Sequence, residues 1–87
     1  MREDQTHIIS SAVVSVMPAA MDQIKSELAA LPGTEVGPTG ENKIVIVLEG
    51  RTRGELGARL AQIALMDGVV TANMVFEHIE EDKELSP

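Results

Sequence analysis

Two segments with helical periodicity separate four segments of strand character, and this order constrains the fold more than any other feature of the chain. Residues 7–16, 43–49 and 69–78 are rich in valine and isoleucine, as strands are. A shorter strand is predicted at 34–36. The glycine- and proline-containing turn at 37–42 then joins it to the strand at 43–49, so these two strands are predicted to form a hairpin.

The first helical segment follows the first strand. Pro18 suits its first turn, where the missing N–H costs nothing, and Pro32 with Gly33 ends it. Apolar residues recur every three or four positions and mark its buried stripe: Met21, Ile24, Leu28 and Leu31.

The second helical segment begins after Thr52, a predicted N-cap. Glu55 follows at the spacing of a capping box, and Gly68 ends the segment. Its predicted buried stripe consists of Leu56, Leu60, Ile63 and Ala64.

The resulting order, βαββαβ, predicts an α+β fold. Right-handed crossovers place both helices on one face of a four-stranded antiparallel sheet, which is the ferredoxin-like sandwich. A chain of 87 residues forms one domain. We expect this domain to span residues 7–78, with a disordered N-terminus at 1–6 and a flexible acidic tail at 79–87.

Strand alternation sorts the residues of the sheet between the helix-covered face and the opposite one, called the open face below. The helix-covered face is predicted to take Ile8, Ser10, Ala12, Val14, Val16, Ile44, Ile46, Leu48, Val70, Ala72, Met74 and Phe76, with Val69 pointing away. Ser10 would need a hydrogen-bond partner there. The open face is predicted to take small side chains, with charge at its margins: Ile9, Ser11, Val13, Ser15, Val45, Val47, Glu49, Thr71, Asn73, Val75 and Glu77.

Composition excludes several classes of function. The chain has no cysteine, which removes disulfides, thiolate metal sites and thiol catalysis. A net charge of −7 argues against nucleic-acid binding. His7 and His78 near two strand ends lack a third metal ligand, and no nucleophile–base pair is visible. We therefore expect no metal, no cofactor and no enzymatic activity. No signal peptide or membrane span is visible, so a cytoplasmic protein is predicted.

Four segments then carry a resemblance to a known family. SSAVVSV (10–16), ALPGTEV (30–36), KIVIVLEG (43–50) and MDGVVTANMVFEHIEED (66–82) together resemble NapD, in the same order and over almost the whole chain. This family consists of small cytoplasmic chaperones for maturation of the periplasmic nitrate reductase NapA. The resemblance implies a ferredoxin-like fold without a cofactor. It also implies binding of the helical twin-arginine signal peptide of the NapA precursor to the sheet surface, which holds the precursor back from Tat export until its molybdenum cofactor is inserted.

The residues of the open face suit such a ligand. Under this hypothesis Val13, Val45, Val47 and Val75 contact the apolar side of the peptide, and Ser11, Ser15, Thr71 and Asn73 bond its polar groups. Glu49 or Glu77 would attract the arginines.

Other interpretations of the residues stay open at this point. The open face is also consistent with an ordinary solvated sheet, or with self-association into a weak homodimer. A regulatory domain of the ACT type, which binds a small molecule, shares the βαββαβ order. A scaffold subunit that pairs through its sheet is a third class of function.

Overall fold

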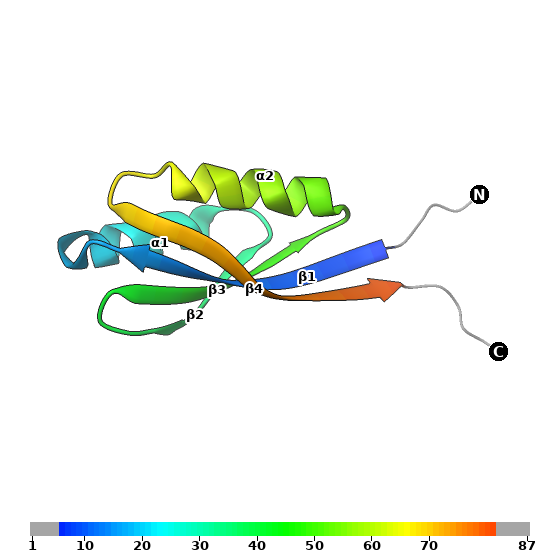
Figure 1. Cartoon of the computed structure of the whole chain (residues 1–87), viewed down its shortest axis with the longest axis horizontal. Helices are drawn as coiled ribbons and strands as arrows, with labels where there is room; N and C mark the ends of the chain where they lie inside the picture. Colours follow the sequence, from blue (N-terminus) through cyan, green and yellow to red (C-terminus); the bar gives the residue numbers. More distant parts are fainter. Residues whose placement is uncertain (1–5, 82–87) are drawn as a thin grey trace.

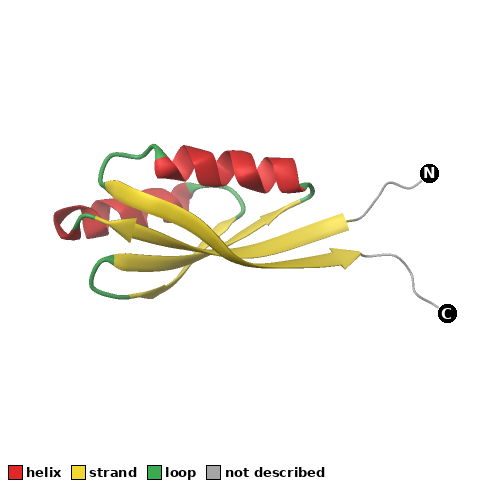
Figure 2. Ribbon diagram, viewed as in Figure 1, coloured by secondary structure: helices red, strands yellow, loops and turns green. Residues whose placement is uncertain are grey.

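The computed structural model describes residues 6–81, and its elements follow the predicted βαββαβ order. They are β1 (Thr6–Val16), a single 3₁₀ turn η1 (Pro18–Ala20), α1 (Met21–Ala30), β2 (Thr34–Thr39), β3 (Lys43–Gly50), α2 (Arg53–Ala64) and β4 (Val69–Glu81). The four strands form one sheet in the order β2-β3-β1-β4, and every neighbouring pair is antiparallel. Both helices lie on the same side of this sheet (Figures 1 and 2), so the ferredoxin-like prediction is confirmed.

The start of α2 follows from its capping residues. The Thr52 Oγ1 accepts a hydrogen bond from the Glu55 backbone N–H at 3.0 Å, which confirms the predicted N-cap. The Glu55 carboxylate accepts a hydrogen bond from the Arg51 backbone N–H at 2.9 Å. This bond, together with the nearby Arg59 guanidinium, holds the pKa of the Glu55 carboxyl below its usual value.

Aliphatic side chains from one face of the sheet and from both helices form the core. Eleven of them are buried: Ile8, Ala12, Val14, Val16, Ile24, Leu28, Ile44, Ile46, Leu48, Leu56 and Ile63. Met21, Leu31 and Leu60 pack against this core while staying partly exposed. Ala64 was predicted in the buried stripe of α2, but it is exposed in the last turn of the helix.

Two bulges change the faces of β4. The consecutive residues Ser11 and Ala12 on β1 pair with Phe76 and Met74 on β4, so Val75 is an extra residue on β4. In the same way Ser15 and Val16 pair with Thr71 and Val69, so Val70 is a second extra residue on β4. Each extra residue reverses the alternation beyond it, because successive side chains otherwise point to opposite faces.

The predicted faces of β4 are therefore correct only between the bulges. Ala72 and Met74 share the helix side with Val14 and Ala12, as expected. Phe76 was predicted in the core, but it pairs with Ser11 on the open side. Val69 and Val70 were likewise assigned wrongly, since Val69 pairs with the buried Val16 and Val70 is a bulge residue that is 59% exposed.

The strands extend beyond the predicted domain at both ends. Thr6 pairs with Glu81, so β1 begins at residue 6 and β4 continues to residue 81, beyond the predicted domain bounds of 7 and 78. The remaining parts of the two predicted disordered segments, residues 1–5 and 82–87, lie outside the described residues.

Candidate functional site: the open face of the sheet

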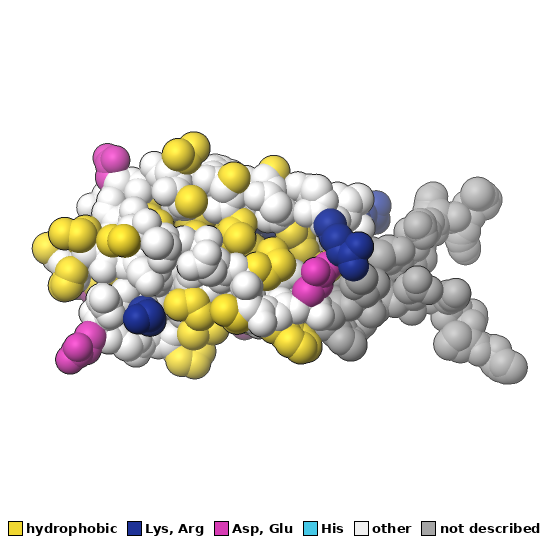
Figure 3. Space-filling model, in the orientation of Figure 1, with side chains coloured by type: hydrophobic (Ala, Val, Ile, Leu, Met, Phe, Trp, Pro, Cys, Tyr) yellow, Lys and Arg dark blue, Asp and Glu magenta, His cyan; other side chains and the backbone are white. Residues whose placement is uncertain are grey.

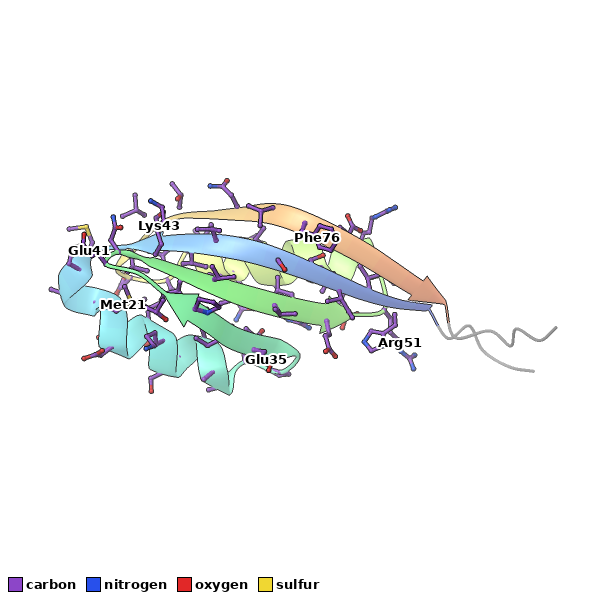
Figure 4. The ribbon with its side chains drawn as sticks, turned by 90° about the horizontal axis from the view of Figure 1, so that it is seen from below. Met21, Glu35, Glu41, Lys43, Arg51 and Phe76 are labelled. Carbon is purple, nitrogen blue, oxygen red and sulfur yellow. The ribbon has the colours of Figure 1, made fainter. Side chains whose placement is uncertain are left out.

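No described element covers the sheet face opposite the helices, which Figure 4 shows toward the viewer. Strand register arranges its side chains in rows that run across the sheet. The first row holds Glu49 and Ile9; the second holds Glu35, Val47, Ser11 and Phe76; the third holds Val45, Val13 and Asn73; the fourth holds Lys43, Ser15 and Thr71. Nine of the eleven residues predicted for this face therefore lie on it, and Val75 and Glu77 do not belong to its paired rows.

The middle of the open face is a floor of small side chains. Ser11 and Val13 on β1 lie beside Val47 and Val45 on β3, and all four are partly buried although no described element packs above them. Gly37 on β2 extends this low region, since it has no side chain. A Cβ added there would lie 3.2 Å from the Val45 carbonyl oxygen. An uncharged, low floor of this kind accepts close approach by a flat or cylindrical partner.

One aromatic side chain projects from the open face at its β4 edge. Phe76, the single aromatic residue of the chain, is 58% exposed and lies directly across from Ser11. Figure 3 shows apolar side chains gathered on the side of the molecule where Figure 1 places β4. Simple alternation assigns Phe76 to the core, and no residue pattern in β4 indicates the bulge that exposes it.

At the opposite edge, two carboxylates border a shallow hollow. The hollow has a volume of about 280 Å³ and is lined by Gly33, Thr34, Glu35, Val47 and Glu49. The Glu49 Oε1 lies 3.3 Å from the His7 Nε2. Glu35 was not among the predicted site residues, because Gly37 and Pro38 interrupt the alternation of the short second strand. Its pairing with Val47 places it on the open face.

Glu77 does not lie on the open face. It pairs with the buried Ser10, and its Oε2 accepts a hydrogen bond of 2.7 Å from the Arg53 Nε at the start of α2. The predicted placement of Glu77 on the open face is therefore wrong. The bulge at Val75 is the reason, since it turns Glu77 toward the helices.

Ser10 lies on the helix side, as predicted, and is completely buried. Within the described residues its Oγ has no hydrogen-bond partner. A buried hydroxyl without a partner costs about 1–3 kcal/mol of stability. Leu48 and Glu77 are its cross-strand neighbours, and the Glu77 carboxylate is directed to Arg53 instead.

The described part of the chain contains no cluster of three or more residues suited to hold a metal ion. His7 and His78 are not directly opposite each other, since His7 pairs with Glu80 and Ile9 with His78. Among residues 6–81, neither helix has the length and hydropathy needed to cross a membrane.

Fold and open face together define a small ferredoxin-like domain with one uncovered, low and largely uncharged sheet surface. A family model described as "NapD protein" matches residues 7–81. The chain belongs to the NapD family.

Two individual proteins illustrate this relationship. "Chaperone NapD" of Paracoccus pantotrophus is 45% identical over 71 residues, which cover 82% of this chain and 63% of that protein. This chain thus matches somewhat less than two thirds of its relative's length. The solution structure of the E. coli Tat proofreading chaperone protein NapD superposes with a TM-score of 0.76 over 93% of this chain and 87% of the other, at 24% identity. At that identity the likeness concerns the fold.

Proposed function

We propose that this protein is a non-enzymatic, cytoplasmic chaperone that binds the twin-arginine signal peptide of the precursor of the periplasmic nitrate reductase catalytic subunit, NapA. By covering the signal, it delays Tat export until the molybdenum cofactor has been inserted into the precursor. Membership of the NapD family supports this proposal, as do the names of the two relatives, a chaperone and a Tat proofreading chaperone. The chaperone itself needs no cofactor for this role.

The low floor of the open face is the observation that carries the proposal. Neighbouring strands lie about 4.8 Å apart, so the four strands offer a surface about 14 Å wide. An α-helix with its side chains is about 10–12 Å across, and it fits that width. Large charged side chains in the middle of the floor would prevent its approach, and Ser11, Val13, Val45 and Val47 stand there instead.

The roles within this surface follow from side-chain chemistry. Val13, Val45 and Val47 contact the apolar side of the peptide, and Ile9 extends this contact along β1. Ser11, Ser15, Thr71 and Asn73 bond its polar groups, and the Glu49 carboxylate attracts arginine. Val75, exposed in the bulge, and Glu77, directed at Arg53, contribute at most from the edge.

Calorimetric titration with a synthetic twin-arginine signal peptide tests the proposal. We expect saturable binding to the intact chain, and weaker binding when both arginines of the peptide are replaced by lysine, because lysine cannot bond a carboxylate in the bidentate manner of arginine. No heat and no shift in Tm with either peptide would refute the proposal. A Tm raised by a free amino acid would favour a regulatory domain of the ACT type instead, and a dimer unaffected by peptide would favour a scaffold subunit.

A further inference from the structure

The two ends of the open face differ in charge. Glu35 and Glu49 border the hollow at one end, whereas Lys43 lies beside Ser15 and Thr71 in the last row at the other. Figure 4 shows Lys43 at one end of the sheet and Glu35 on the edge strand β2, nearer the middle. Two rows lie between the row of Glu49 and the row of Lys43, and the central residues of these two rows, Ser11, Val13, Val45 and Val47, carry no charge.

Two arginines near the acidic end are engaged on the helix side of the sheet. On the helix side, the Arg59 Nη2 lies 3.5 Å from the Glu55 Oε2, and its Nη1 donates to the Glu49 backbone oxygen at 2.9 Å. Arg53 pairs with Glu77 on that same side. His7 lies beside the Glu49 carboxylate, while Arg51 follows β3 at this end (Figure 4). The two carboxylates on the open face itself, those of Glu35 and Glu49, remain exposed to an approaching cation.

The positions of the larger side chains leave one diagonal path across the open face. Phe76 stands on β4 in the second row, and Lys43 stands on β3 in the fourth row. These two larger side chains flank a path that begins at the acidic hollow, crosses Val47, Ser11 and Val13, and ends at Asn73 and Thr71. The path spans three strand spacings of about 4.8 Å and two side-chain rows of about 6.6 Å, so its diagonal is about 20 Å long and accommodates a helix of about 13 residues.

We propose that the open face holds its peptide in one direction along this diagonal. The cationic N-terminal end of the helix lies over Glu35 and Glu49, its apolar turns pack on Val47, Ser11 and Val13, and Phe76 supports one flank. The helix dipole reinforces this direction, because it places partial positive charge at the two carboxylates and partial negative charge toward Lys43. The proposal rests on the proposed function and assigns the direction of binding and a part for Glu35 and Phe76.

Spin labels at the two ends of the face measure the direction. The chain has no cysteine, so Arg51→Cys and Glu41→Cys each provide a single attachment point, one beyond each end of β3. We expect the label at 51 to broaden the NMR signals of the N-terminal peptide residues, and the label at 41 to broaden those of the C-terminal residues. The opposite pattern, or equal broadening by both labels, would overturn the proposed direction while leaving the proposed function intact. No binding by the unlabelled chain would instead refute the proposed function.

Charge reversal provides an independent test with a matched control. Glu35→Lys and Glu41→Lys change the net charge equally, but only Glu35 borders the hollow. We expect Glu35→Lys to weaken binding at least ten-fold and Glu41→Lys less than two-fold, with unchanged Tm in both. The difference should vanish with a peptide whose two arginines are alanine. Equal losses in the two variants would overturn the proposal, as would a concentration-dependent dimer that occupies the face in place of the peptide.

Discussion

Replacing Ser11 with lysine is the sharpest perturbation of the open face. Ser11 lies in the middle of the floor, between Val47 and Phe76, and its side chain points away from the core. A lysine there holds a helix away from the sheet or forces burial of an unpaired ammonium group, which is costly. The core residues on the other face of β1 are not touched, so the fold should be retained.

The size of the effect follows from the apolar surface that the displaced peptide no longer covers. Val13, Val45 and Val47 are partly exposed, and covering a whole valine contributes about 1.5–3 kcal/mol. Completing the burial of three half-covered valines thus contributes about 2–4 kcal/mol, which corresponds to a change in Kd of roughly 30- to 1,000-fold.

Titration calorimetry with the signal peptide measures this weakening, and thermal unfolding checks that Tm is unchanged. Ser26→Lys, on the exposed surface of α1, is the matched control and should bind as the unsubstituted chain does. Normal binding by Ser11→Lys would refute the assignment of the open face as the binding surface.

Four further outcomes are expected. Phe76→Ala should weaken peptide binding several-fold with little change in Tm, because the ring is 58% exposed; an unfolded variant would place the ring in the core. Glu77→Gln should bind the peptide normally while Glu49→Gln binds more weakly, and equal weakening in titrations would contradict the turn of Glu77 toward α2. Ser10→Ala should raise the free energy of unfolding by about 1 kcal/mol in urea titrations, since it removes a buried hydroxyl without a partner among the described residues. The pKa of the Glu55 carboxyl is lower in the folded protein than in the unfolded chain, so this carboxylate stabilises the fold at pH values above its unfolded-state pKa. The stabilisation is lost as the pH falls through the folded-state pKa. Glu55→Gln should therefore flatten the acid side of the profile of stability against pH.

Much of the site was accessible from alternation alone. The first and third strands run without interruption, so Ile9, Ser11, Val13 and Ser15 could be separated correctly from Ile8, Ala12, Val14 and Val16. The N-cap at Thr52 could also be predicted from local sequence, since it depends on residues within one helical turn. These predictions succeeded because the controlling interactions lie close in sequence.

The errors concentrate in β4, where the controlling interaction is the register against β1. The bulges at Val70 and Val75 arise from pairing between strands more than fifty residues apart in the chain, and nothing within β4 marks them. They move Phe76 onto the open face and Glu77 off it. The second strand failed for a related reason, because Glu35 acquires its face only from its pairing with Val47.

The sequence by itself therefore determined the order of the elements, the ferredoxin-like fold, the family and the small side chains at the centre of the open face. Local periodicity, capping and turn chemistry specify these features, and they act within a few residues. Only the tertiary structure decided which aromatic and which carboxylates border that face. Their positions depend on the pairing of β4 with β1 and of β2 with β3, and one added residue in a strand reverses every side chain beyond it.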